Sequence, residues 1–429
     1  MKYVKFLLLP ALLTATSVFC QSKTDLLPSL ETLIQQHELI SLVDSELDAA
    51  KQQIEVEKAA WYPTISVSGK YGRERIFRDI GSNANNNPSS ISLLLRQKVW
   101  DFGKVSTAID KAEQNAGRKQ LERNLQEQNL MLAGIEAYIG LKSSYRVAAY
   151  AAQSERNIKT QAKLEDTRIS SGKGYTADAL QAKAQLAGAQ ARRVISQQTL
   201  ASAKNRFQAV FRQSPPTAKQ LQNVTEPVNL LPAHLDFALD ALATSNPDVL
   251  RDKAGVSIAQ ADIALISARE WMPSLDVVLQ TRKERNQDGI SGDRNNNAIY
   301  LQFNWDYSLG SKASYSVKTA VATMAAQQYK ADYTFIKAKE ETQNAWSDLI
   351  FARQRAAFLN DQAGIAKQFL NLARKERELG RRSLIDVLAG ETSLINAQSD
   401  HSAAQADVIT SAYRTLRSMG QLSLSTLKK

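Results

Sequence analysis

The residue types that most often perform catalysis are few in this chain of 429 residues and lie far apart. Its histidines are His37, His234 and His401, and its single cysteine is Cys20. Neither a Gly-x-Ser-x-Gly nor a His-Glu-x-x-His motif occurs, and Gly172-Lys173 lacks the other residues of a phosphate-binding loop. The sequence therefore predicts a protein that is not an enzyme and that holds no cofactor and no metal.

Charged residues instead gather at two glycine turns. Asp178 lies six residues after Gly172, and Asp386 lies six residues after Gly380. Arg382 lies between Gly380 and Asp386. A carboxylate repeated around a symmetry axis attracts cations and repels anions in a narrow opening. The alternative interpretation is local. An acid near the start of a helix is stabilised by the helix dipole, and Arg382 is then only a solvated turn residue.

The elements that position these residues belong to an internal duplication. The repeated landmarks are Trp61-Tyr62-Pro63 with Trp271-Met272-Pro273, Trp100-Asp101-Phe102 with Trp305-Asp306-Tyr307, and Gly172 and Asp178 with Gly380 and Asp386. Their offsets of 210, 205 and 208 residues are nearly constant. The chain is therefore two copies of one unit, 21–213 and 248–420. A proline-rich linker, 214–247, joins them, and a tail, 421–429, follows.

Each copy is predicted to contain one β-hairpin, at 64–99 and at 274–309. In the segment 297–309, Ile299, Leu301 and Phe303 alternate with polar residues, which is typical of a strand with one apolar face. Strands of about ten residues have the length that a tilted membrane-spanning strand requires. Asp288 and Asp293 lie in a polar connection, and their spacing favours a solvated turn over a calcium site.

Large aromatic residues lie at the ends of these strands or just outside them. They are Trp61, Trp100, Trp271, Trp305 and Tyr307. Ordinary strand packing is one interpretation. Their shared position favours an aromatic band at a membrane interface.

Each hairpin is followed by a long predicted helix, 104–171 or 312–379, each about 100 Å long if it is continuous. No proline lies between residues 89 and 214 or after residue 273. From Val317 to Ala373, steps of four and three residues select seventeen positions, fifteen of them apolar. Such a sustained heptad seam indicates a coiled coil. Returning helices are predicted at 175–213 and 383–419.

The expected fold class is an α+β membrane protein with long coiled-coil helices and four amphipathic strands per chain. Four strands do not close a membrane barrel, which needs at least about eight, so oligomerisation is required. Three chains would supply a 12-stranded β-barrel carrying a periplasmic α-helical barrel, although the strand number leaves two or four chains open.

The first twenty residues resemble a secretory signal peptide. They contain two lysines, an apolar run from Phe6 to Leu13 that is too short to span a bilayer, and small residues toward Cys20. Phe19, which precedes Cys20, favours cleavage over lipidation of the cysteine. Export argues against nucleic acid as a partner, despite the net charge of +11.

Together these motifs resemble the TolC family of outer membrane channel proteins. The resemblance rests on the two repeats, the Trp-Tyr-Pro strand start, the segment 100–103 and the turn 380–388, and it covers essentially the whole mature chain. It implies a homotrimer in the outer membrane of a Gram-negative bacterium. Its helical tip would dock onto a periplasmic adaptor (membrane fusion) protein and an inner-membrane transporter, for which the ABC type is favoured.

The same resemblance places a periplasmic gate at the glycine turns. Asp386 matches an aspartate that rings the pore constriction in the family, and Arg382 and Asp178 match members of a polar network that holds the tip closed. Ala389 stands where some members have a second aspartate, and Arg377 where some have a tyrosine. We therefore expect one acidic ring and a differently connected lock.

Within the channel interpretation, the substrate is either a protein or a small molecule. The favoured function is the exit duct of a type I secretion system, with a large adhesin as one type of cargo. The alternative is the outer membrane component of a multidrug or metal efflux pump. A secreted coiled-coil fibre would explain the heptads but not the four strands and their aromatic ends.

Overall fold

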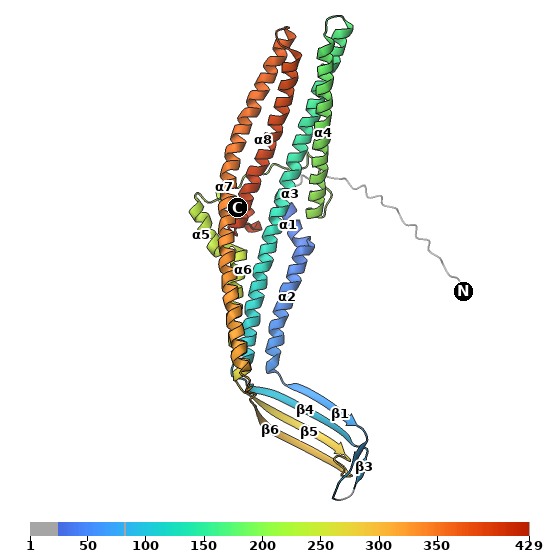
Figure 1. The fold of residues 1–429 in the computed structure, drawn as a ribbon, viewed down its shortest axis with the longest axis vertical. Helices are drawn as coiled ribbons and strands as arrows, with labels where there is room; N and C mark the ends of the chain where they lie inside the picture. The colour runs from blue at the N-terminus through green and yellow to red at the C-terminus, as the bar shows by residue number, and fades with distance from the viewer. Residues whose placement is uncertain (1–24, 81–82, 429) are drawn as a thin grey trace, which may run out of the picture.

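The computed structural model describes residues 25–80 and 83–428, and the predicted signal peptide lies outside them. A β-sheet occupies one end of the elongated molecule, and two long helical hairpins occupy the other (Figure 1). The remaining short helices lie near the middle, beside the roots of the hairpins.

The first half of the chain alternates helices with a hairpin of strands. Its elements are α1 (Leu26–Gln36), α2 (Glu38–Lys58), the 3-10 helix η1 (Ala59–Trp61), β1 (Thr64–Tyr71), β2 (Glu74–Ile76), β3 (Ala84–Asn86), β4 (Ser89–Trp100), α3 (Lys104–Ser170) and α4 (Thr176–Phe211). The repeated Trp-Asp-Phe motif has a structural role here. Asp101 Oδ2 accepts a hydrogen bond of 2.8 Å from the Val105 amide, which helps to start α3 where β4 ends.

The linker and the second half repeat this plan. They contain the 3-10 helix η2 (Val228–Leu230), α5 (Leu235–Ser245), α6 (Pro247–Trp271), β5 (Ser274–Arg285), β6 (Asp293–Asn304), α7 (Lys312–Glu378), α8 (Leu384–Ser418) and α9 (Leu424–Leu427). The linker 214–247 and the tail 421–429 thus each contain a short helix.

The main sheet is antiparallel and has the strand order β1-β4-β5-β6, so its centre joins the two halves of the chain. One row across the sheet consists of Ile65, Leu95, Leu279 and Ile299, which are paired in register. Most of this apolar row is exposed. Within the described residues, β1 and β6 each have one edge that pairs with no other strand.

The last strand differs from the predicted segment 297–309. It begins at Asp293, which pairs with Arg285, and ends at Asn304, which pairs with Ser274. The early residues are polar on both faces, so hydrophobic alternation does not reveal them. Beyond Asn304, the next residue on the neighbouring strand side is Pro273, which precedes β5. Proline has no amide hydrogen with which to continue the ladder.

Helix α7 packs against α6 in its lower part and against α8 in its upper part (Figure 1). Buried residues on the predicted seam of α7 include Ala338, Thr342, Leu349 and Leu370. Near the start of α7, however, Val321 is exposed and Ala320 is buried instead. A straight helix drifts away from a strict heptad stripe, and the packing partner of α7 also changes along its length.

The largest hydrophobic core lies at mid-height, where α1, α3, the end of α4 and the end of α8 meet. Leu30, Met131, Tyr138, Phe207 and Leu416 are among its buried members. In residues 25–80 and 83–428, no helix combines the length and apolar character needed to cross a membrane.

Candidate functional site

The candidate site is the tip formed by the turns of the two helical hairpins. Both turns have the same backbone geometry, with Gly172 at φ +71° and Gly380 at φ +73°. The Lys173 amide donates to Arg168 O at 2.9 Å, and the Arg381 amide donates to Glu376 O at 2.8 Å. These are two copies of a Schellman turn, in which glycine adopts the left-handed conformation at little cost.

The two predicted aspartates both lie in the first turn of a returning helix. Asp178 is in α4 and Asp386 is in α8, whose N-terminus is capped by the Ser383 hydroxyl accepting from the Asp386 amide at 3.2 Å. This is the favourable position for a carboxylate relative to a helix dipole. The Asp386 side chain also remains 47% exposed, so it is accessible to ions at the tip.

Arg382 binds groups of its own hairpin. Its Nε donates to Glu376 Oε2 at 2.6 Å, its Nη1 lies 3.6 Å from Asp386 Oδ2, and its guanidinium lies 5.5 Å from the centre of the Phe369 ring. The hydrogen bond to Glu376, together with the charge of that carboxylate, raises the pKa of Arg382. Arg382 therefore stabilises the second turn through contacts within its own hairpin, and it is not a freely solvated turn residue.

Arg377 connects the two hairpins. Its Nη2 donates to Glu165 Oε1 on α3 at 3.0 Å and lies 3.9 Å from Asp178 Oδ2 on α4. Its Nη1 donates to the Arg382 carbonyl at 3.2 Å. The Glu165 side chain is only 3% exposed, and Arg168 on the same helix also donates to it at 3.1 Å. A buried carboxylate thus ties both copies of the repeat together.

A second connection lies farther from the tip. The Glu391 side chain on α8 is 3% exposed, forms an ion pair with Arg374 of α7, and accepts a hydrogen bond of 3.2 Å from Asn157 Nδ2 of α3. Glu165, Glu391 and Arg374 were not among the predicted site residues. The sequence does contain a signal for the two glutamates, because Glu165 and Glu391 occupy positions at seam spacing among apolar neighbours, and both are buried.

The five predicted aromatic residues lie elsewhere, where the sheet meets the helices. Trp305 Nε1 donates to the Trp271 carbonyl at 3.3 Å, and the rings of Trp271 and Trp305 each approach Tyr307. Trp61 precedes β1 and Trp100 ends β4 at this same end of the sheet. A fifth tryptophan, Trp346, belongs to α7 and is not part of the group.

The chemistry of the tip is electrostatic. Its carboxylates and guanidinium groups hold helices together and leave one acid, Asp386, partly exposed. In the described part of the chain, no group of three or more His, Cys, Asp or Glu side chains is arranged to hold a metal ion.

Comparison with known proteins follows the same division of the chain. Residues 30–211 and 238–421 match the family model described as outer membrane efflux protein. The chain belongs to the outer membrane efflux protein family. This confirms the predicted resemblance at the level of the TolC-like family, while the type I secretion branch remains a prediction.

Relatives of this family member include three outer membrane or secretion proteins. The chain is 22% identical to the outer membrane efflux protein BepC of Brucella suis over 88% of this chain and 81% of the relative. It is 23% identical to the outer membrane protein TolC of Escherichia coli, over 92% and 83%. It is 20% identical to the alkaline protease secretion protein AprF of Pseudomonas aeruginosa, over 91% and 81%.

The fold of this family member is also found in solved structures. The outer membrane channel OprN matches with a TM-score of 0.79 at 17% identity, over 92% of this chain and 90% of that one. The protein is therefore an outer membrane channel of the efflux family, and its helical hairpins form the long periplasmic extension.

Proposed function

We propose that three copies of this chain form the outer membrane exit duct of a tripartite machine that secretes protein by the type I route. Substrate passes from an inner-membrane transporter, favoured to be of the ABC type, through a periplasmic adaptor into the duct. The duct conducts passively and performs no catalysis.

The observation that best supports a duct is the four-stranded sheet with its two unpaired edges. An unpaired edge in lipid leaves backbone groups without hydrogen bonds, so the edge strands β1 and β6 require partners. Joining β6 of one copy to β1 of the next, three times, gives a closed 12-stranded barrel. The exposed row of Ile65, Leu279 and Ile299 then supplies apolar surface for outer membrane lipid.

The tip supports a gate at the other end of the duct. Three copies of Asp386 would form an acidic ring, and the Arg377–Glu165 ion pair would hold neighbouring hairpins together in the closed state. The closed tip would open when the adaptor and transporter engage it. Each hairpin would contribute a charged side chain to this lock, Glu165 from the first hairpin and Arg377 from the second.

Secretion is favoured over small-molecule efflux by one relative, since AprF is a secretion protein and aligns over most of both chains. A specific observation favours the second candidate, a multidrug or metal efflux duct, because BepC is an efflux protein and the family description is efflux. Both candidates use the same duct and differ in the inner-membrane partner.

The deciding experiment compares a deletion strain with its parent and with a complemented strain. Secreted and surface-bound proteins are scored by mass spectrometry, beside susceptibility to dyes, detergents, antibiotics and metal salts. Loss of one large secreted protein with unchanged susceptibility supports the secretion duct. Hypersusceptibility with an intact secretome overturns it in favour of efflux.

A further inference from the structure

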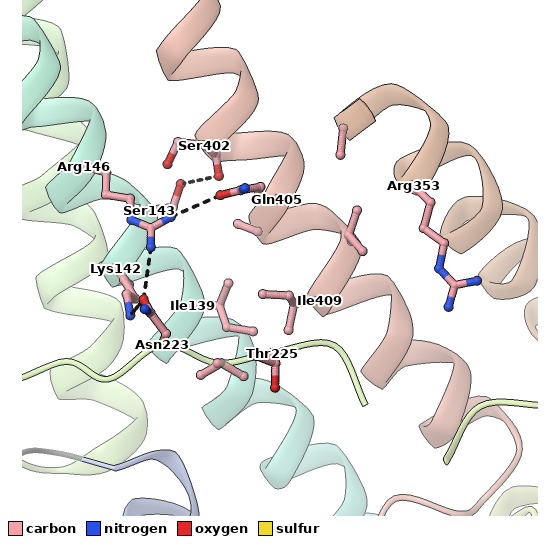
Figure 2. Close-up of a pocket in the computed structure, with 14 residues that line it drawn as sticks. Ile139, Lys142, Ser143, Arg146, Asn223, Thr225, Arg353, Ser402, Gln405 and Ile409 are labelled. Carbon is pink, nitrogen blue, oxygen red and sulfur yellow. Dashed lines mark hydrogen bonds between the residues drawn. The ribbon is translucent and has the colours of Figure 1, made fainter. Parts of the chain in front are cut away.

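A cavity of about 480 Å³ lies at mid-height, away from both the tip and the sheet. Figure 2 shows it between α3 and α8, with α7 on the far side and the linker segment 223–225 crossing below. Its volume falls in the range of about 300–1,000 Å³ that is typical of small-molecule sites. The proposed duct function gives this cavity no role.

Three cations line the cavity: Lys142, Arg146 and Arg353. In the described part of the chain, no acidic side chain lines it. Arg353 is neutralised by an ion pair with Glu226, which is in the linker. The other two cations form no ion pair with any carboxylate among the described residues.

Lys142 and Arg146 are held by neutral oxygens. Lys142 Nζ donates to Asn223 Oδ1 at 2.5 Å, and it also donates to the Gln222 carbonyl and, at 3.5 Å, to the Leu221 carbonyl. Arg146 donates to Asn223 Oδ1 at 3.2 Å and to Gln405 Oε1 at 3.3 Å (Figure 2). Burial, followed by the charge of Arg146, lowers the pKa of Lys142 to about 8. Neutral oxygens leave the charges of these two neighbouring cations unbalanced, so an anionic group would be attracted to both.

A buried hydroxyl is also without a partner at this site. Ser402 is only 4% exposed and lines the cavity, and its Oγ forms no hydrogen bond with any described residue. Its carbonyl does accept from Ser143 Oγ at 3.3 Å (Figure 2). A buried polar atom without a partner is costly, so this hydroxyl is a ready donor to a ligand.

Apart from Ser143 and Thr225, the remaining lining is apolar. The apolar side chains are Ile139 of α3, Val224 of the linker, Ala356 of α7, and Ala406, Val408 and Ile409 of α8. Several of these side chains pack on the main core, so the apolar surface is built into rigid elements. The cavity therefore combines one cationic corner with an apolar remainder.

We propose that this cavity binds an anionic amphiphile with a single alkyl chain, with its head group at Lys142, Arg146 and Ser402 and its chain over Ile139, Val224 and Ile409. A carboxylate or a phosphate head group satisfies the same donors. A neutral alcohol of equal chain length lacks the charge that the two cations require.

The test uses the full-length protein, purified from outer membranes in a neutral detergent. A dodecanoate that carries a diazirine is photo-crosslinked to it, and labelled peptides are mapped by mass spectrometry. Unlabelled dodecanoate, dodecyl phosphate and dodecanol serve as competitors. The variants are Arg146→Gln and the milder Ser402→Ala. Arg355→Gln is the matched control, because Arg355 lies on α7 beside the cavity but does not line it.

We expect labelling in the segments around residues 139–146 and 402–409. It should fall about tenfold in Arg146→Gln, the effect of losing one charged hydrogen bond, and stay unchanged in Arg355→Gln. Ser402→Ala should weaken labelling without changing the heat resistance of the oligomer. Competition by dodecanoate or by dodecyl phosphate, with dodecanol about tenfold weaker, identifies the preferred head group.

Three results would overturn the proposal. They are labelling confined to the sheet, equal labelling of both arginine variants and the unsubstituted protein, and equal competition by dodecanol and dodecanoate. None of these results bears on secretion or efflux, which the deletion strain tests separately.

Discussion

Arg377 Nη2 lies 3.0 Å from Glu165 Oε1, and this contact joins α7 of the second hairpin to α3 of the first. Because the two residues come from different copies of the repeat, the ion pair fixes one hairpin against the other at the tip. Among the described residues, by contrast, the charged and aromatic contacts of Arg382 all lie within its own hairpin. The two arginines therefore have different effects on opening.

Glu165→Gln should raise single-channel conductance in planar bilayers. The change removes a buried charge from the contact between hairpins, which is worth on the order of 1.5–3 kcal/mol. Arg168→Gln is the matched control, because the ion pair that Arg168 forms with Glu165 among the described residues lies within α3. Equal conductance in Glu165→Gln and the unsubstituted channel would remove this contact from the gate.

Arg382→Ser should also raise conductance, but by less than Glu165→Gln. Its loss frees Glu376 and Asp386 within one turn and leaves the Arg377–Glu165 contact in place. The same bilayer recording measures it. A larger effect for Arg382→Ser would show that the turn itself, and not the contact between hairpins, limits the opening.

Asp386→Asn should weaken cation selectivity and block by multivalent cations. Three copies of this partly exposed carboxylate near a symmetry axis would produce both properties. Reversal potentials in a salt gradient measure the selectivity. Asp236→Asn, an exposed acid on α5 away from the tip, should leave both unchanged. Unaltered reversal potentials in Asp386→Asn would leave this aspartate with local roles, at the helix dipole and beside Arg382.

Phe358→Asp should reduce the heat-resistant oligomer seen in gel electrophoresis. Phe358 is 74% exposed and belongs to an apolar stripe on α7 with a spacing of seven residues, formed by Phe351, Phe358, Ile365 and Leu372. A repeated stripe of this kind requires a partner helix. Asn360→Asp adds the same charge on the opposite side of α7 and should have no effect. An equally stable oligomer in both variants would place this stripe outside the interface between copies.

The free energy of unfolding should rise with pH between about 8 and about 10.4 because of Lys142. Its pKa in the folded state is lowered, so in this window the unfolded chain binds more protons and raising the pH favours folding. Arg146 and Arg353 are the other cations that line the cavity, and Glu226 forms an ion pair with Arg353.

Thermal unfolding followed by circular dichroism over this pH window measures the effect. Lys142→Met should flatten the rise, while Lys159→Met, an exposed lysine on the same helix, should not. An identical pH dependence in Lys142→Met and the unsubstituted protein would contradict the assignment.

Local patterns predicted much of the architecture. Proline-free heptads predict the long helices, and helices are present at Lys104–Ser170 and Lys312–Glu378. Glycine in the left-handed conformation ends both helices, at Gly172 and Gly380. Alternation did not reveal the start of β6, because Asp293 and its neighbours are polar on both faces and are held only by pairing with β5.

The tip was predicted in part. Asp386, Arg382 and Arg377 come together at the second turn, because neighbours in sequence meet where a chain reverses. Asp178 belongs to the first turn, and the packing of the two hairpins brings it to 3.9 Å from Arg377. Their buried partner Glu165 lies 212 residues from Arg377, and no pattern near either residue specifies the other. The available signal was a charged residue at an apolar seam position. Such a signal marks Glu165 but does not identify the residue that pairs with it.

The sequence by itself therefore determined the duplication, the long helices, the glycine turns and the family. Only the tertiary structure decided the contacts between hairpins and the cavity near Lys142, which unite residues of α3, the linker, α7 and α8. Those contacts depend on the axial register of helices about 100 Å long, and a slip of one turn, about 5.4 Å, would break all of them. Register is set by the sum of many small packing contacts along each helix, so it is a property of the folded chain and not of any local motif.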